Sequence, residues 1–406
     1  MLGHIDADSF FASVLQRKHP HLRGKALLAL GMGGGCVIAA SYEAKATGVK
    51  TGMPLKEARQ LCPGAVEMPC DYRETSIASK QLENLLGDVC PVIEQFSIDE
   101  WFFDLRTIQG GEPKDLYAWG IDLQRIMWSK TGLSVSIGIG PNKLLAKMGS
   151  EYKKPSGVSV VVPDGQPIDR ARRTFGIEEF LRDRPAPAIP GIGRKRTVHT
   201  EQHGWKTAWD IAIAPTPQLI KLFGRPGADL QRELKGELLY KITTEDIDPK
   251  SVSRCRSFRA TTDRKYAWAH VLHHAEYVVN RMRKRQLACR GISVWLRDST
   301  YRSGRSANCS LPQAMDTEEL LLPFIRNAFD EAWQEGFRCT QAGLGLWRLE
   351  PSHTAQYSLF EETSVRDEDE ELQEHLDEIR LKYGRDAVVR GSALPVSEGT
   401  KPAVNF

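Results

Sequence analysis

Residues 94–105, EQFSIDEWFFDL, place two carboxylates side by side in a segment that is otherwise rich in aromatic residues. The aromatic residues predict a buried strand, and adjacent residues of a strand point to opposite faces. Asp99 or Glu100 must therefore meet an apolar layer unless the strand ends or turns there, because an unpaired buried carboxylate is costly. A turn between strands, open to water, would explain the pair simply. The pattern indicates a site only if other parts of the chain point to the same chemistry.

The length of 406 residues predicts about three domains, or two and a tail, because single cores seldom grow beyond ~250–300 residues. No apolar run approaches the ~18 residues that cross a bilayer, and the first residues lack the basic and apolar regions of a signal peptide. The eight cysteines include no C-x-x-C pair and no zinc-ligand spacing. We therefore expect a cytoplasmic protein with reduced thiols and no membrane partner.

Charge divides the chain into a basic body and an acidic tail. Residues 1–360 carry a net charge of +9, whereas residues 361–406 carry 12 acidic and 6 basic side chains. The range 251–300 holds 11 Lys and Arg residues against 3 Asp and Glu residues, with a tight basic cluster at 281–285. Such a stripe suits a nucleic-acid backbone, because neutralised phosphates release their counterions. A solvated helix face would give the same pattern.

Strands and helices alternate as far as about residue 162, which predicts an α/β domain. HIDADSFFASV begins as a strand and becomes a helix at about Ser9, so Asp6 lies at a strand end. The Asp99–Glu100 pair also lies at a strand end or turn. This common placement is what a shared site would require.

Beyond about residue 162 the strands and helices no longer alternate regularly. Residues 189–196, IPGIGRKR, predict a helical hairpin whose backbone N–H groups and helix N-terminus can hold a phosphate, although an ordinary turn is the alternative. Residues 251–349 predict a separate α+β module. Residues 366–384 predict one exposed helix in an otherwise loose acidic tail.

Five segments occur in the order and approximate spacing of one known family. They are HIDADSFFASV (4–14), SYEAKATGVKTGMP (41–54), FSIDEWFFDL (96–105), SVSIGIGPNKLLAKMGSEYKKPSGV (134–158) and IPGIGRKR (189–196). On these segments the chain resembles the Y-family translesion DNA polymerases of the bacterial UmuC and DinB groups, over roughly residues 1–350. Residues 35–52 and the long tail are more like the UmuC group.

The resemblance implies a multidomain α/β and α+β fold of the right-hand polymerase type. Its parts map onto the sequence as palm at 1–10 and 71–162, fingers at 11–70, a thumb with a helix-hairpin-helix at 163–240, a linker at 241–250, a separate little finger at 251–350 and an acidic tail at 351–406. The implied activity is low-fidelity, template-directed insertion of deoxynucleotides opposite damaged bases, as part of DNA repair and the SOS response. The protein would then be associated with the nucleoid.

In this family, carboxylates hold two metal ions for phosphoryl transfer. The resemblance assigns that role to Asp6, Asp99 and Glu100, with the carbonyl of Ala7, and implies two Mg²⁺ ions, for which Mn²⁺ can substitute. Metal charge would compensate an acidic pair set against aromatic residues. Asp8 is not a ligand in the family pattern, and we expect it to cap the helix that begins at Ser9.

The resemblance also implies which residues hold the incoming deoxynucleoside triphosphate. Tyr42 and Lys45 match triphosphate-binding residues of the fingers, with Lys45 where many relatives have Arg, and Lys154 matches a lysine of the palm. Phe11 matches the aromatic side chain that excludes a ribose 2′-hydroxyl, and the adjacent Phe10 is assigned to the same nucleotide-binding site. A plain core position is the alternative for Phe11.

Further residues are assigned to DNA and protein partners. Contacts with primer-template DNA are expected from Gly191, Gly193, Arg194 and Lys195 in the hairpin and from Arg254 and Arg256 in the basic module. Gln356, Leu359 and Phe360 of AQYSLFEE (355–362) resemble a peptide that binds the bacterial sliding clamp, with Tyr357 where Leu is usual. A chance apolar cluster is the alternative. The sequence leaves open an accessory subunit, the lesion preference and the role of the tail.

Two other functions stay open. A clamp-binding repair adaptor with weak or no catalysis would keep the fold, but relatives of that kind lose the carboxylates, and all three are present here. A nucleotide cyclase or nuclease could use a similar palm and two metals. The hairpin and the basic module favour a polymerase over a cyclase.

Overall fold

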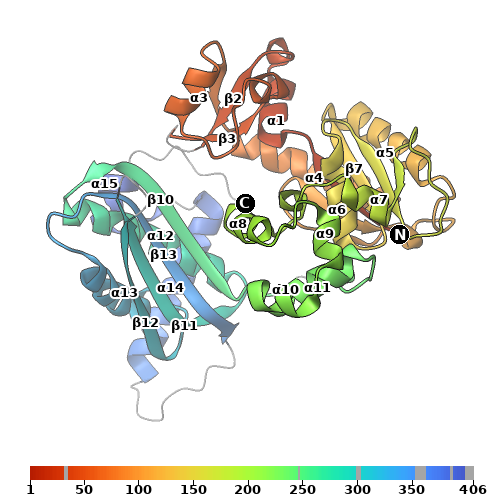
Figure 1. Cartoon of the computed structure of the whole chain (residues 1–406). Helices are drawn as coiled ribbons and strands as arrows, with labels where there is room; N and C mark the ends of the chain where they lie inside the picture. The colour runs from red at the N-terminus through yellow and green to blue at the C-terminus, as the bar shows by residue number, and fades with distance from the viewer. Residues whose placement is uncertain (32–34, 246, 299–302, 353–362, 385–386, 398–406) are drawn as a thin grey trace. The chain divides into compact units, whose positions relative to one another are not determined.

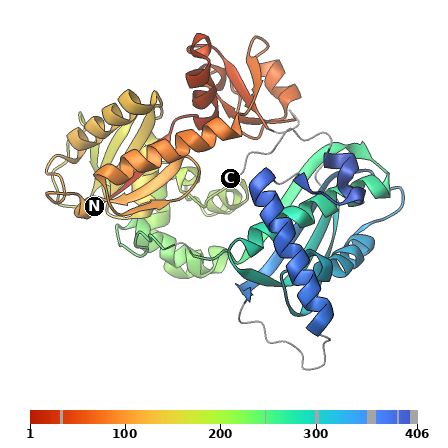
Figure 2. The same ribbon diagram turned by 180° about the vertical axis from the view of Figure 1, so that it is seen from behind.

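The computed structural model describes the chain except for residues 32–34, 246, 299–302, 353–362, 385–386 and 398–406. The chain divides into two compact units, Met1–Glu245 and Asp246–Phe406. Figures 1 and 2 show the elements of each unit from opposite sides. No helix in the described part of the chain is both long and apolar enough to span a bilayer.

A six-stranded sheet in the order β5-β6-β1-β7-β8-β9 forms the centre of the first unit. The strands are β1 (Leu2–Ala7), β5 (Ile93–Gln95), β6 (Glu100–Asp104), β7 (Val135–Gly140), β8 (Val158–Val162) and β9 (Thr174–Gly176). Alternate residues such as Ile5, Trp101 and Phe103 enter a core shared with α4 (Tyr72–Val89) and α5 (Leu116–Thr131). The predicted α/β layer is confirmed.

The opposite face of this sheet packs against α6 (Lys143–Tyr152). Close approach depends on Gly138 of β7, because a Cβ atom there would lie 1.9 Å from the carbonyl oxygen of Ala146. The helices around the sheet begin at side-chain caps: the side chains of Asp71, Asp115 and Asn142 each accept a hydrogen bond from a backbone N–H in the first turn.

A smaller three-stranded sheet, β3-β2-β4, forms within residues 11–70. Its strands are β2 (Leu27–Leu30), β3 (Val37–Ala40) and β4 (Val66–Pro69), and its helices are α1 (Phe10–Lys18), the 3₁₀ turn η1 (Pro20–Leu22), α2 (Tyr42–Lys45) and α3 (Leu55–Leu61). Alanines of these elements are fully buried, and their small side chains let the helices lie close to the sheet.

A helical section follows, with α7 (Ile177–Arg182), η3 (Ala186–Ala188), α8 (Arg194–Gln202), α9 (Ala208–Ile213), α10 (Thr216–Phe223) and α11 (Arg225–Leu234). Ile189 and Ile192 of the predicted hairpin are buried in its core. Strand β9, which lies inside the range expected for the thumb, pairs in parallel with β8 and forms the edge of the large sheet. A short 3₁₀ turn, η2 (Leu105–Thr107), follows β6.

The second unit contains a four-stranded antiparallel sheet in the order β10-β13-β11-β12. Its elements are β10 (Ser251–Thr261), α12 (Arg264–Arg283), β11 (Leu287–Arg297), β12 (Gly304–Met315), α13 (Glu318–Ala332) and β13 (Cys339–Pro351). Helices α12 and α13 cover one face of the sheet and bury its apolar residues. This is the predicted α+β module.

The acidic tail differs from the loose segment expected. The predicted helix forms as α14 (Thr363–Tyr383), but one side of it packs on α12 and α13 of the same unit (Figure 2). The buried Arg380 guanidinium lies 2.6 Å from the Glu318 carboxylate at the start of α13, and Asp377 accepts a bond of 2.8 Å from Arg283. The Gln373 side chain accepts a hydrogen bond from the Glu318 N–H and so caps the start of α13. The side chain of Thr317, the N-cap residue of α13, makes no such bond. Past α14, η6 (Gly391–Ala393) and α15 (Leu394–Ser397) lie against α12.

Candidate active site

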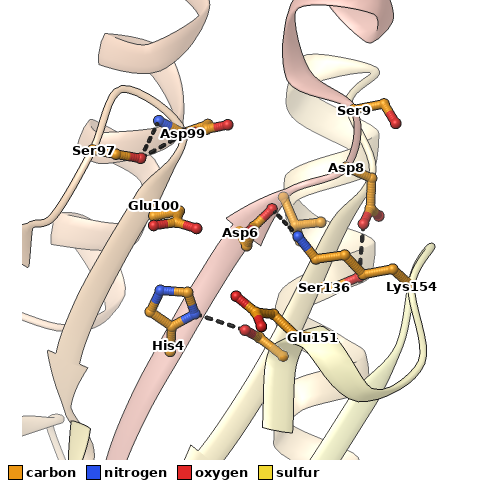
Figure 3. A network of polar contacts seen from close by, with 12 residues as sticks. His4, Asp6, Asp8, Ser9, Ser97, Asp99, Glu100, Ser136, Glu151 and Lys154 are labelled. Carbon is orange, nitrogen blue, oxygen red and sulfur yellow. Dashed lines mark hydrogen bonds and ion pairs between the residues drawn. The ribbon is translucent and has the colours of Figure 1, made fainter. Parts of the chain in front are cut away.

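The three predicted carboxylates lie at one end of the ladder between β1 and β6. Asp6 is opposite Glu100 in the antiparallel register, and the Ala7 N–H donates to the Asp99 carbonyl at 2.9 Å. Asp99 occupies the bend directly before β6, so the turn expected for an acidic pair exists. Glu100 faces the α6 side, whereas Trp101 points into the core. Figure 3 shows the carboxylates on both sides of this ladder end.

Each carboxylate already has a partner of its own. The Lys154 ammonium lies 2.5 Å from Asp6 Oδ1, and the Lys147 ammonium lies 2.7 Å from Glu100 Oε1. The Ser97 hydroxyl donates to Asp99 Oδ1 at 2.5 Å. Among the described residues, no three His, Cys, Asp or Glu side chains are placed so that they could bind one ion together. The sequence-predicted ligands are therefore brought to one place but are turned toward these partners.

Burial and charge repulsion disturb the titration of these groups. Burial, opposed by Lys154 and reinforced by Glu100, raises the pKa of Asp6 to about 7. Burial also raises the pKa of Asp99. For Glu100, burial acts in the same direction, but bonds with Asp6 and Lys147 outweigh it and leave the pKa lowered. These hard oxygen donors fit Mg²⁺, since a divalent cation would relieve the repulsion that favours protonation of Asp6.

Tyr42 and Lys45 of α2 and Lys154 of the loop after α6 lie within electrostatic range of Asp6. The Lys45 ammonium donates to the Ser9 hydroxyl at 2.7 Å and lies 4.6 Å from the centre of the Tyr42 ring. Burial, and then the positive charge of Lys154, lowers the pKa of Lys45. The two ammonium groups are therefore electrostatic neighbours, and an anion placed between them would be stabilised.

The two adjacent phenylalanines have different environments. Phe10 is only 2% exposed and belongs to the core of the large sheet, so its ring is not open to a ligand as placed. Phe11 is partly exposed and contacts the ring of Tyr72 edge-on, with 5.9 Å between the ring centres. Of the pair, Phe11 has the accessible surface that a contact with a sugar needs.

Asp8 does not cap α1, so that expectation was wrong. The helix begins at Phe10, its N-cap residue Ser9 has a left-handed backbone with φ 47°, and no side chain makes the cap hydrogen bond. The Asp8 carboxylate is instead fully buried and accepts from the Ser136 hydroxyl at 2.7 Å, as drawn in Figure 3.

The residues predicted to contact DNA lie in two places. Arg194 and Lys195 are exposed at the start of α8, next to Gly191, whose φ of 93° favours glycine, and to Gly193. Arg254 lies on the helix side of β10, with its guanidinium 4.2 Å from the centre of the Tyr277 ring of α12. Arg256 shares that side by strand alternation. The other side of β10 presents serines and Cys255.

Two tryptophans lie on the face of the second sheet that α12 and α13 do not cover, and the sequence patterns above do not predict them. Trp295 of β11 lies over Gly343 of β13, and Trp347 of β13 lies over Gly291 of β11, since a Cβ atom on either glycine would come within 2.4 Å of the indole. The signal in the sequence is a glycine four residues before each tryptophan, on the same face of its strand, in RGISVW (290–295) and GLGLW (343–347). Gln356, Leu359 and Phe360, the predicted clamp-binding residues, lie outside the described residues.

Comparison with known proteins agrees with this fold. Residues 5–151 match the impB/mucB/samB family, and residues 249–359 match the C-terminal domain of that family. "DNA polymerase IV" of Moorella thermoacetica is 31% identical over 401 residues, covering 96% of this chain and 95% of the relative. "Protein SamB" of Salmonella typhimurium is 30% identical over 394 residues, covering 93% and 90%.

Among solved structures, a Y-family DNA polymerase chimera of Dbh and Dpo4 superposes with a TM-score of 0.70 at 22% identity, covering 86% of this chain and 98% of the chimera. DinB from Sulfolobus solfataricus superposes with a TM-score of 0.56 at 23% identity. The fold of this chain is therefore the fold of these Y-family DNA polymerase structures. The chain belongs to the impB/mucB/samB family, so the family predicted from the five sequence segments is confirmed.

Proposed function

We propose that this protein is a translesion DNA polymerase that inserts deoxynucleotides opposite damaged template bases by two-metal phosphoryl transfer. The observation that carries the proposal is the contact of the Lys154 ammonium with the Asp6 carboxylate at one end of the large sheet, where the Lys45 ammonium, bonded to Ser9, is an electrostatic neighbour of both. A carboxylate cluster suits divalent cations, and the adjacent cations suit a triphosphate. A site with both chemistries matches the needs of nucleotidyl transfer.

Asp6, Asp99, Glu100 and the Ala7 carbonyl would hold two Mg²⁺ ions. The ions would neutralise charge on the phosphates and activate the primer 3′-oxygen. To bind Mg²⁺, each carboxylate would have to leave its present partner. For Asp6 and Glu100 these partners are lysines, and Lys154 released in this way would be free to bind the triphosphate.

Lys154, Lys45 and Tyr42 would hold the triphosphate, and the partly exposed ring of Phe11 would exclude ribonucleotides by collision with the 2′-hydroxyl. Arg194 and Lys195, with the hairpin glycines Gly191 and Gly193, would bind a phosphate of the DNA through backbone N–H groups and charge. Arg256 and Arg254 are weaker candidates, because their strand positions face α12 rather than the open side of the sheet.

Primer extension with Mg²⁺ on undamaged and damaged templates tests this function. Extension past a lesion that stops a replicative polymerase is the expected result, with little discrimination between correct and incorrect nucleotides. The repair adaptor, the alternative function, predicts DNA or clamp binding with no extension on either template. The presence of all three carboxylates favours the enzyme.

A further inference from the structure

Asp8 stands out because a fully buried carboxylate lies next to the candidate site without belonging to its ligands. It follows Ala7, the last residue of β1, and Figure 3 shows it directed toward Ser136, whereas Asp99 and Glu100 lie on the other side of Asp6. Removing a carboxylate from water is costly unless hydrogen bonds compensate. The groups that compensate Asp8 therefore indicate what the residue does.

Three donors from three different elements meet this carboxylate. Asp8 Oδ1 accepts from the Ser136 hydroxyl of β7 at 2.7 Å and from the Tyr42 hydroxyl of α2 at 3.3 Å. Asp8 Oδ2 accepts from the Ser156 N–H at 2.8 Å. Ser136 in turn accepts from the Gly157 N–H at 3.3 Å. Two successive amides of the loop after Lys154 are thus held, directly or through Ser136, by one carboxylate.

The loop needs such support. Ser156 has a left-handed backbone with φ 53°, which residues other than glycine adopt only when their surroundings hold them there. Lys154 lies two residues earlier and reaches Asp6, and Tyr42 carries the Lys45 ammonium over its ring. The charge of Asp8 also opposes the burial that lowers the pKa of Lys45.

We propose that Asp8 is a positioning residue, which sets Tyr42 and the Lys154 loop at the separation that the triphosphate requires. It acts through those two groups and does not touch the reacting atoms. The proposal rests on the proposed function, because it assumes that Tyr42 and Lys154 bind the triphosphate.

Single-nucleotide insertion by the full-length enzyme on an undamaged primer-template tests this role. Asp8→Ala should raise the KM for the deoxynucleotide about tenfold and lower kcat by less than about threefold, because ground-state placement of the triphosphate is lost. Asp8→Asn keeps the size and part of the acceptor capacity, so its KM should lie between those of Asp8→Ala and wild type. If Asp8→Ala fails to fold, Asp8→Asn carries the same comparison.

The matched control is Asp104→Ala. Asp104 is also a buried carboxylate of the same sheet, but it lies at the other end of β6 and pairs with Arg106. A purely structural role for Asp8 predicts that both variants lower the unfolding temperature and that neither changes the KM. In the double variant Asp8→Ala with Tyr42→Phe, the KM increases should be less than multiplicative, because the two changes remove the same contact.

Tyr42→Phe and Lys154→Ala separate the two proposals. If they raise the KM and neither Asp8 variant does, the positioning role of Asp8 is overturned while the nucleotide pocket stands. If none of these variants raises the KM, the assignment of Tyr42 and Lys154 falls, and the role of Asp8 falls with it. A raised KM in the Asp8 variants, with Asp104→Ala unchanged, supports the positioning role.

Discussion

At the scale of single residues, a substitution of Asp99, a proposed metal ligand, tests metal binding separately from DNA binding. Asp99→Asn should lower the rate of nucleotide addition by at least ~100-fold, because a ligand charge is lost, and should leave the affinity for primer-template within about twofold. Single-turnover insertion and fluorescence anisotropy measure the two effects. Ser97→Ala, which removes only the hydroxyl that donates to Asp99, is the control with a milder defect. If Asp99→Asn adds nucleotides at the wild-type rate, Asp99 is not a metal ligand.

The raised pKa of Asp6 predicts how the Mg²⁺ requirement of the activity changes with pH. Its pKa is raised to about 7 in the folded protein, mainly by burial, so the carboxyl is protonated below that pH and ionised above it. If Asp6 holds Mg²⁺ as proposed, a proton and the metal ion compete for the same oxygens, and the Mg²⁺ concentration for half-maximal activity should rise as pH falls from 8 to 6. Activity profiles at low and saturating Mg²⁺ measure this, and saturating Mg²⁺ should move the midpoint to lower pH. Identical midpoints would contradict the competition.

The carboxylate pair shows what the residues alone predict. The sequence predicts Asp99 and Glu100 at a strand end, and the structure confirms that placement, since a buried strand cannot carry both carboxylates without a turn or a counter-charge. The sequence predicts a triphosphate contact for Lys154, which in the structure lies against Asp6. It does not predict the contact of Lys147 with Glu100, because nothing local links a helix residue to a strand end.

At the scale of elements, the contact between β7 and α6 depends on Gly138. Gly138→Ala should destabilise the first unit by about 2–4 kcal/mol, because the added Cβ would lie 1.9 Å from the Ala146 carbonyl and the backbone would have to move. Denaturant unfolding measures the change. Gly64→Ala is the matched control, since a Cβ at that position meets no atom within 4 Å. Equal stability of the two variants would show that α6 can shift freely.

The docked side of α14 gives a second prediction at this scale. Arg380→Ala should destabilise the second unit by about 3 kcal/mol, because, among the described residues, the buried Glu318 carboxylate would keep Arg390 alone, at 3.3 Å, as an ion-pair partner. Lys382→Ala, on an exposed position of the same helix, should change stability little. Thermal unfolding of the full-length variants tests the difference. An unchanged transition for Arg380→Ala would mean that the tail adds nothing to this unit.

At the scale of the whole molecule, α14 follows the proposed clamp peptide in the chain and belongs to the same unit as β13, which precedes it. The peptide is therefore joined to that unit at both ends. If Gln356, Leu359 and Phe360 bind the sliding clamp, Leu359→Ala with Phe360→Ala should abolish stimulation of synthesis by the clamp, since apolar anchors carry most of such affinity. Synthesis without the clamp should stay unchanged. Titration of the clamp with a peptide of residues 353–363 measures binding directly, and no binding at tens of micromolar would indicate a chance cluster.

The family, the alternation of strands and helices, and the positions of the carboxylates at strand ends all follow from the order of the residues. Strand and helix periodicity is a local property, and motif order along the chain is visible without a fold. Folding in three dimensions was needed to show that Asp8 holds Tyr42 and the Lys154 loop, that Arg254 faces α12, and that α14 packs on α13. These facts depend on contacts between residues far apart in the chain. The packing of several elements fixes such contacts together, and no single segment encodes them.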